Sequence, residues 1–406
     1  MNMNSRSIQR SFCAVLAFSG ALLALPAQPA PRTPVDDATV IEKLPFRAKD
    51  SHAKELEALR AIARKAPDDP TAAAALALAY FEMAQARGDP RYVGYADAVV
   101  KQFDQPMSAD LLVLRGMLHQ YRHDFDEALV DFAAALALEP DRASAHAWRG
   151  AIYLVQAKYD NARQECGALL QLHRPVLHGG CIGLVQAYTG QLRSAYATLQ
   201  QALALARHDD QRLWLLTRLG EVSAWLGQNA RAERHYRDAL ALGRDDGYLL
   251  AAWTDFLLEN KRPAEVVKLL AAWEASDPLL LRLAEAETLL QIGAAKAHVQ
   301  ALDDRFAAAK LRGDTTHRAE EARFQLRLRK NATLAVQLAA TNYKVQKEPR
   351  DLRVLLEAAL AASDSDAAKP ARDWLQSTGF EDERLRKLAA QTMRLPSAAI
   401  KPVVRP

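Results

Sequence analysis

Apolar residues recur along most of this chain with the spacing of a helix face, not with the alternation of a strand. The stretch that ends at Pro140 reads LLVLRGMLHQYRHDFDEALVDFAAALALEP, and its apolar positions return every three or four residues. A short polar stretch around His123 interrupts the pattern once. This spacing predicts two amphipathic helices joined by a tight turn. Further helical patterns cover 54–65, 71–86, 279–292, 319–329 and 334–345.

The same two-helix pattern repeats. Four glycines are each followed by an alanine twelve residues later, in the pairs Gly116 and Ala128, Gly150 and Ala162, Gly183 and Ala195, Gly220 and Ala232. The distance between successive units varies, whereas the distance within a unit does not. Packing therefore fixes the internal spacing, because two antiparallel helices approach closely only where both side chains are small, and the variable residues fall in loops.

The residues around these pairs resemble the tetratricopeptide repeat. In the first unit the signature positions hold Gly116, Phe125, Ala128, Phe132, Ala135 and Pro140. Four clear units cover 109–244, and weaker ones extend on both sides, where Ala252 and Ala264, and Ala359 and Ala371, are again twelve apart. The resemblance implies an all-α solenoid, a right-handed superhelix of about eight to nine helical hairpins over 51–394, with atypical terminal units. The charged segment Glu381–Arg394 is expected to form a solvating cap.

The N-terminus has the pattern of a secretory signal. Arg6 and Arg10 precede an uncharged run from Phe12 to Leu25, which is too short to span a bilayer but suits a signal sequence. We expect a signal peptide at 1–27, a linker at 28–50 and a disordered tail at 395–406, with export to the periplasm or the medium of a bacterial cell and no stable membrane span after cleavage. The alternative is an uncleaved N-terminal anchor.

Composition and motifs argue against catalysis and nucleic-acid binding. The formal net charge of +4 over 406 residues gives no bulk attraction to nucleic acid. The sequence contains no His-Glu-x-x-His, no Gly-x-Ser-x-Gly, no phosphate loop and no dinucleotide fingerprint. We therefore expect a protein that is not an enzyme and needs no cofactor.

Two arginines stand directly before repeat glycines. Arg115 and Arg149 are each followed sixteen residues later by an acid, Asp131 and Glu165 respectively. In the third and fourth units neither the arginine nor the acid is present. Because a buried charge requires a partner, we expect structural salt bridges within the first two units, with ligand binding as the alternative.

Cys166 and Cys181 fall on neighbouring helices of successive units, so a disulfide is geometrically plausible in an oxidising compartment. Two free, packed thiols are the first alternative. Metal binding together with His173 and His178 is the second, although their spacing matches no compact zinc module.

Aromatic residues recur on the first helix of several units, on the side that the resemblance places in the concave groove. This aromatic row comprises Tyr121, Tyr188, Trp214, Trp225 and Trp253. The resemblance implies a scaffold or adaptor of the cell envelope that binds a protein or peptide in this groove. One alternative for the rings is packing between helices. The alternative functions are an accessory role in envelope polysaccharide export or cell-wall assembly and, as a minor one, metal handling.

Overall fold

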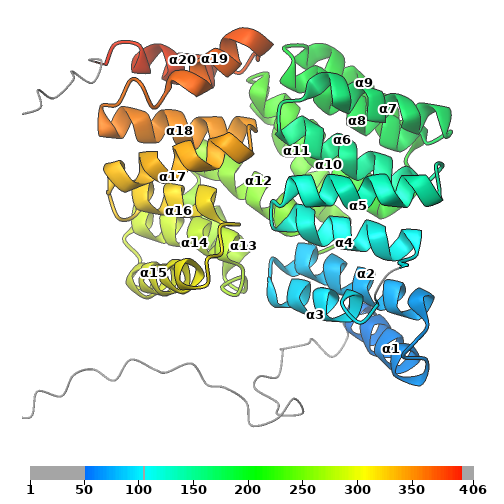
Figure 1. Ribbon diagram of the computed structural model, residues 1–406. Coiled ribbons are helices and arrows are strands. Elements are labelled where there is room, and N and C mark those ends of the chain that lie inside the picture. The colour runs from blue at the N-terminus through cyan, green and yellow to red at the C-terminus, as the bar shows by residue number, and fades with distance from the viewer. Residues whose placement is uncertain (1–50, 104–105, 396–406) are drawn as a thin grey trace, which may run out of the picture. The chain divides into compact units, whose positions relative to one another are not determined.

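The computed structural model describes residues 51–103 and 106–395; the expected signal peptide, linker and all but the first residue of the tail lie outside this part of the chain. The described residues form twenty α-helices and no strand (Figure 1). The all-α architecture is thus confirmed. The helices are α1 (Ser51–Lys65), α2 (Pro70–Arg87), α3 (Arg91–Val100), α4 (Ala109–Tyr121), α5 (Phe125–Leu138), α6 (Ala143–Val155), α7 (Tyr159–Gln171), α8 (Pro175–Tyr188), α9 (Leu192–Leu205), α10 (Asp209–Trp225), α11 (Asn229–Ala241), α12 (Gly247–Glu259), α13 (Pro263–Leu270), α14 (Asp277–Leu290), α15 (Ala295–Leu311), α16 (Arg318–Arg327), α17 (Ala332–Val345), α18 (Pro349–Ala362), α19 (Lys369–Thr378) and α20 (Glu383–Thr392).

Consecutive helices from α2 to α19 pack as nine hairpins, the first being α2 with α3 and the last α18 with α19. This number agrees with the eight to nine units predicted. Helix α1 packs on α2 at one end of the series, and α20 packs on α18 and α19 at the other. Among the described helices, none is both long enough and apolar enough to cross a membrane.

Small residues set the distance between the two helices of a hairpin. An added Cβ at Gly116 would lie 2.7 Å from the ring of Phe132, and one at Gly220 would lie 2.7 Å from the ring of Tyr236. The facing alanines are fully buried, with 0% exposure at Ala128, Ala162, Ala195 and Ala232. The constant twelve-residue spacing is therefore the signature of one crossing point that is repeated along the chain.

The turn inside each of these four hairpins places its left-handed residue at the same position, seven after the repeat glycine. Its occupants are His123, Ala157, Gly190 and Gly227, with φ of 64°, 59°, 76° and 73°. In each turn, the next residue donates its backbone N–H to the carbonyl five residues earlier, as Gln191 does to Gln186 at 3.0 Å. This bond satisfies a carbonyl that the helix end would otherwise leave without a donor.

The C-terminal hairpins share a hydrophobic core with hairpins that precede them by many residues in the chain. One continuous core joins Leu199 and Leu219 of α9 and α10 to Leu355 of α18 and to Phe380, and all four are fully buried. The last repeats therefore pack against earlier ones. This packing covers the residues that the sequence predicts to line a groove.

Candidate functional site

The aromatic row expected to line a groove is covered by the chain itself. Tyr188 is 2% exposed, and its ring lies 6.0 Å from that of Trp225 and 6.4 Å from that of Phe380. Phe380, which follows α19, is fully buried and lies 5.3 Å from Trp225. Tyr188 thus packs in the interior and the half-buried Trp225 packs against it, as in the alternative raised from the sequence.

The other members of the row are also engaged. Trp214 rests on Gly180, where an added Cβ would lie 2.0 Å from the indole. Trp253 is 4% exposed and stacks on Phe256 at 5.4 Å. Tyr121 is half-buried and meets Phe81 edge-on at 6.3 Å. The row is therefore not an open surface, because each ring packs against a helix or ring of the same chain.

Hydrogen bonds accompany this covering. The N–H of Lys347 donates to the carbonyl of Val155 at 2.7 Å, and the Trp374 indole donates to the Tyr159 hydroxyl at 2.8 Å. The N–H of Leu192, at the start of α9, donates to the carboxylate of Glu381 at 2.7 Å. These three hydrogen bonds thus pair polar groups across the junction.

A buried carboxylate pair lies at the same junction. The Tyr188 hydroxyl donates to Glu348 at 3.3 Å, and Arg350 donates to Glu348 at 2.6 Å. Burial alone would raise the pKa of Glu348, but Arg350 and Arg218 hold it below its ordinary value. Burial, and then the charge of Glu348, raises the pKa of Asp351 to about 7. Glu348 and Asp351 also form the capping box of α18, and this structural role accounts for their position.

A second charged cluster joins α12, α14 and α16. Asp255 accepts from both Arg282 and Arg323 at 2.6 Å, and Arg323 also donates to Glu285 at 2.7 Å. Two acids balance two arginines, which meets the requirement that buried charges be paired. Both partners of Arg323 belong to other helices, so the cluster joins three helices inside the array.

The structure brings together both arginine–acid pairs singled out in the sequence. Arg115 donates to Asp131 at 2.6 Å, and Arg149 donates to Glu165 at 2.9 Å. Glu165 also meets His146, whose Nδ1 lies 2.7 Å from the carboxylate. Each acid lies on the second helix of the hairpin whose first helix carries the arginine, so each pair holds one hairpin together.

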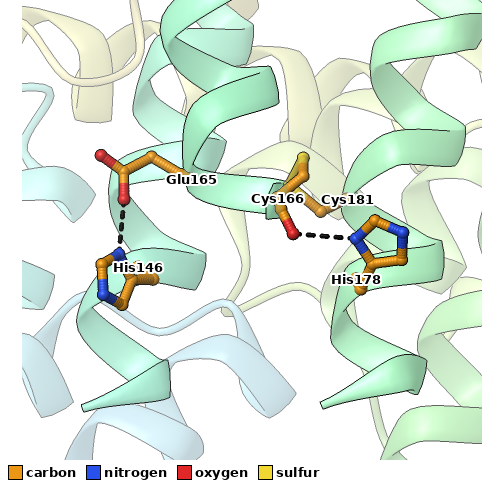
Figure 2. Close-up of a disulfide and its surroundings, with 5 residues drawn as sticks. All are labelled: His146, Glu165, Cys166, His178 and Cys181. Atoms are coloured by element: carbon orange, nitrogen blue, oxygen red, sulfur yellow. Dashed lines mark hydrogen bonds and ion pairs between the residues drawn. A yellow bond between two sulfur atoms is a disulfide. The ribbon is translucent and has the colours of Figure 1, made fainter. Parts of the chain in front are cut away.

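Cys166 and Cys181 form a disulfide that joins α7 to α8, with their Cα atoms 5.5 Å apart (Figure 2). His178, on α8, bonds through Nδ1 to the Cys166 carbonyl at 2.8 Å. His173 is exposed in the turn between these helices. The bridge uses both thiolates that a metal site would need, and no cluster of ligands with metal-binding geometry occurs among the described residues.

Sequence reasoning missed the residues that close the row. Phe380 and Trp374 come from a degenerate hairpin without a repeat glycine, and Gly180 lies outside the glycine–alanine spacing. The available signal was the pattern Trp374 … Gly379-Phe380, an apolar helix face that ends in a left-handed glycine. Helix α20, expected to be a solvating cap, also buries one side, with Leu385 3% exposed.

No family model and no curated protein matches the chain. Among solved structures, a tetratricopeptide repeat protein from Parabacteroides merdae is 15% identical, with 62% of this chain and 91% of that chain covered and a TM-score of 0.39. The human IFIT1 dimer with m7Gppp-AAAA is 14% identical, with coverages of 84% and 85% and a TM-score of 0.42. The APC/C hetero-tetramer Cut9–Hcn1 is 17% identical, with coverages of 76% and 52% and a TM-score of 0.40. Likeness at this level says nothing of what this chain binds.

The repeat is visible in the chain's own geometry. Three of the four repeat glycines lie against a ring or a leucine of the second helix, as Gly116 does against Phe132 and Gly183 against Leu199. The left-handed turn residue keeps one position in all four hairpins. The described residues form an all-helical repeat array, and its hairpins resemble tetratricopeptide repeats.

Proposed function

We propose that this protein is a non-catalytic scaffold of an oxidising compartment outside the cytoplasm, and that it binds a protein partner on the outside of its array. The observation that carries the proposal is the closed aromatic row. Since Phe380 and its neighbours pack on Tyr188 and Trp225, a partner segment cannot reach Tyr188 or the packed face of Trp225 unless a hydrophobic core opens. The binding surface is accordingly placed elsewhere.

The second helices of three consecutive hairpins supply a surface for a partner. Large apolar side chains stand exposed there, and we call them the outer row: Val130 at 68% and Leu138 at 59% on α5, Leu170 at 54% on α7, and Leu205 at 54% on α9. Exposed leucines are ordinary when single, but their presence on successive parallel helices favours contact with another apolar surface.

The compartment is proposed on two features. The N-terminal residues have the basic and apolar pattern of a secretory signal, and Cys166 is fully buried in a disulfide. Disulfides of this kind persist in oxidising compartments and are rare where thiols are kept reduced. Both features favour the cell envelope or the medium.

Site-specific photo-crosslinking tests the proposal. The full chain is expressed in bacteria with a photoreactive residue at 138 or 205 of the outer row, or at 311 as a control. Leu311 is 90% exposed at the end of α15 and lies outside the row. We expect positions 138 and 205 to yield one common polypeptide from the envelope fraction, and the Leu138→Ser/Leu205→Ser variant to lose it.

A common product of this kind that is lost in the variant would support the scaffold. The proposed surface is refuted if positions 138 and 205 crosslink no more than position 311. A crosslink only to a second copy of the chain would instead identify self-association.

A further inference from the structure

A cavity of about 470 Å³ lies beside α4, where the preceding hairpin has a shorter second helix than the three hairpins that follow. Helix α3 has 10 residues, whereas α5 and α9 have 14 and α7 has 13. A full-length second helix would cover more of the neighbouring first helix. The early end of α3, at Val100, leaves this part of α4 open.

The side of the cavity formed by α4 is basic. Arg115, His119 and Arg122 all line it, and their spacing of four and three residues places them on one face of the helix. Asp97 and Lys101, from the end of α3 and the residue after it, line the opposite side. The described part of the lining thus contains three permanent cations and one carboxylate.

Among the described residues of the lining, pairing leaves one positive charge in excess. Asp131, behind the lining, neutralises Arg115 at 2.6 Å. Lys101 and Arg122 share the single carboxylate of Asp97, at 2.7 and 3.2 Å. Two cations that share one acid retain donors for a further anion, and Arg122 is 34% exposed on this side.

His119 lines the cavity beside these cations. Its Nδ1 is closed off from solvent and has no hydrogen-bond partner among the described residues. The nearest acids are Asp124, 3.8 Å from Nδ1, and Asp131, 3.7 Å from Nε2, and both distances exceed a hydrogen bond. A ligand in the cavity would therefore contact the ring of His119 and not Nδ1.

The remainder of the lining is apolar. Val100, Phe103 and Met107 come from the end of α3 and the connection to α4. Met107 is 5% exposed, and Phe103 is half-buried. A ligand with only a charged group would leave this side unused, whereas a short hydrocarbon chain would fit against it.

We propose that this cavity binds a carboxylate that carries a short apolar chain. The carboxylate would lie between Arg122 and Lys101, and the chain would lie against Phe103 and Met107. A singly charged group matches the single excess charge, and a planar carboxylate matches the fork of Arg122. The volume is that of a small-molecule site. The carboxylate is either that of a free organic acid or the C-terminus of a polypeptide.

Calorimetric titration of the full chain tests the proposal and separates the two sources. The probes are hexanoate, hexan-1-ol, the tripeptide acetyl-Ala-Ala-Leu with a free carboxylate, and the same peptide amidated. We expect saturable binding of hexanoate, of the free peptide or of both, and none of hexanol or the amide. Binding of the peptide without hexanoate would indicate a polypeptide terminus, and binding of hexanoate alone would indicate a free acid.

Variants link the binding to the cavity. Arg122→Gln and Lys101→Gln should each weaken binding of the responding carboxylate about tenfold or more, which corresponds to the loss of one charge-assisted hydrogen bond. Lys101 is 74% exposed, so its replacement leaves the fold intact. Arg193→Gln is the matched control, because Arg193 is exposed on α9 outside the cavity. Equal binding of hexanol and hexanoate, unchanged affinity in both cavity variants, or no saturable binding of either carboxylate would overturn the proposal.

Discussion

Phe380 packs edge-on against Trp225, with ring centroids 5.3 Å apart, and so joins the end of α19 to the end of α10. The same phenylalanine contacts Tyr188 and Trp374, at 6.4 and 5.3 Å. A ring from a late, degenerate repeat is thus the centre of the aromatic cluster that early repeats supply. The site expected to hold a partner is filled by the chain.

Truncation of these rings should be costly. Phe380→Ala and Tyr188→Ala should each lower the free energy of unfolding by about 3–5 kcal/mol, because both side chains are almost fully buried and a cavity would remain. Urea denaturation measures the loss. Leu311→Ala, at a position 90% exposed, is the control and should change stability by less than about 0.5 kcal/mol. A loss below about 1 kcal/mol in both ring variants would show that the row is open in solution.

Regular spacing made the local part of this structure predictable. The pairs Arg115 with Asp131 and Arg149 with Glu165 lie within single hairpins, and a constant offset along the chain reveals them. Phe380 and Trp225 are related by no repeat offset. Their contact forms because late hairpins pack against early ones, and this arrangement depends on small rotations between neighbouring hairpins, summed over many hairpins. A local sequence pattern does not determine that summed rotation.

Loss of the disulfide should destabilise the protein measurably. The Cys166→Ala/Cys181→Ala variant should lose about 3 kcal/mol, because the bridge closes a loop with a sequence separation of 15. Peptide mapping without reductant should recover the two cysteines as one linked species. Reductant should lower the melting temperature of the wild type and leave that of the double variant unchanged. Alkylation of both cysteines in the native, unreduced protein would contradict the bridge.

The turn position seven residues after the repeat glycine offers a matched pair of substitutions. Ala157 is left-handed at φ 59°, so Ala157→Gly should raise stability by about 0.5–1 kcal/mol. The reverse change in the next hairpin, Gly190→Ala, should cost at least about 1–2 kcal/mol, since the new Cβ would lie 2.8 Å from the Thr378 carbonyl oxygen. Chemical denaturation of both variants would refute the shared geometry if their effects had the same sign.

Asp351 should make stability fall as pH rises. Its pKa is raised to about 7 in the folded protein, against an ordinary value of 3.8. Between these values the folded state holds a proton that the unfolded state has released, so the stabilisation is complete below about 3.8 and is lost as pH rises through about 7. The asparagine of Asp351→Asn has no titratable proton, so its stability does not change with pH for this reason. The stability of the variant relative to the wild type should therefore increase from pH 5 to pH 8, by about 2–3 kcal/mol.

The quantity to measure is how the difference in unfolding free energy between Asp351→Asn and the wild type changes with pH. The substitution also alters the capping box, but that effect is the same at every pH and cancels in this comparison. His123 is the internal contrast. Burial lowers its pKa to about 4, so its own contribution rises with pH between about 4 and 6.5 and is the same in both proteins. A difference that stays flat from pH 5 to pH 8 would show that the Asp351 pKa is not raised.

The chain's own repeats supply the design for the last test, on the pair Arg115 and Asp131. The third unit holds Ile182 and Thr198 at the corresponding positions, so a hairpin of this kind folds without the ion pair. Asp131→Thr alone leaves Arg115 beside a buried site without its acid and should cost about 1–2 kcal/mol, a moderate figure because Arg115 is 35% exposed and water can reach it. Arg115→Ile alone leaves Asp131, which is 5% exposed, as a buried charge without its arginine, and should cost more, about 3 kcal/mol.

The double variant Arg115→Ile/Asp131→Thr removes both charges and should be more stable than Arg115→Ile alone. Urea denaturation of the four proteins completes a double-mutant cycle, in which a coupling of about 1–2 kcal/mol is expected. Strict additivity of the two single effects would mean that the pair contributes no stabilising coupling to the hairpin.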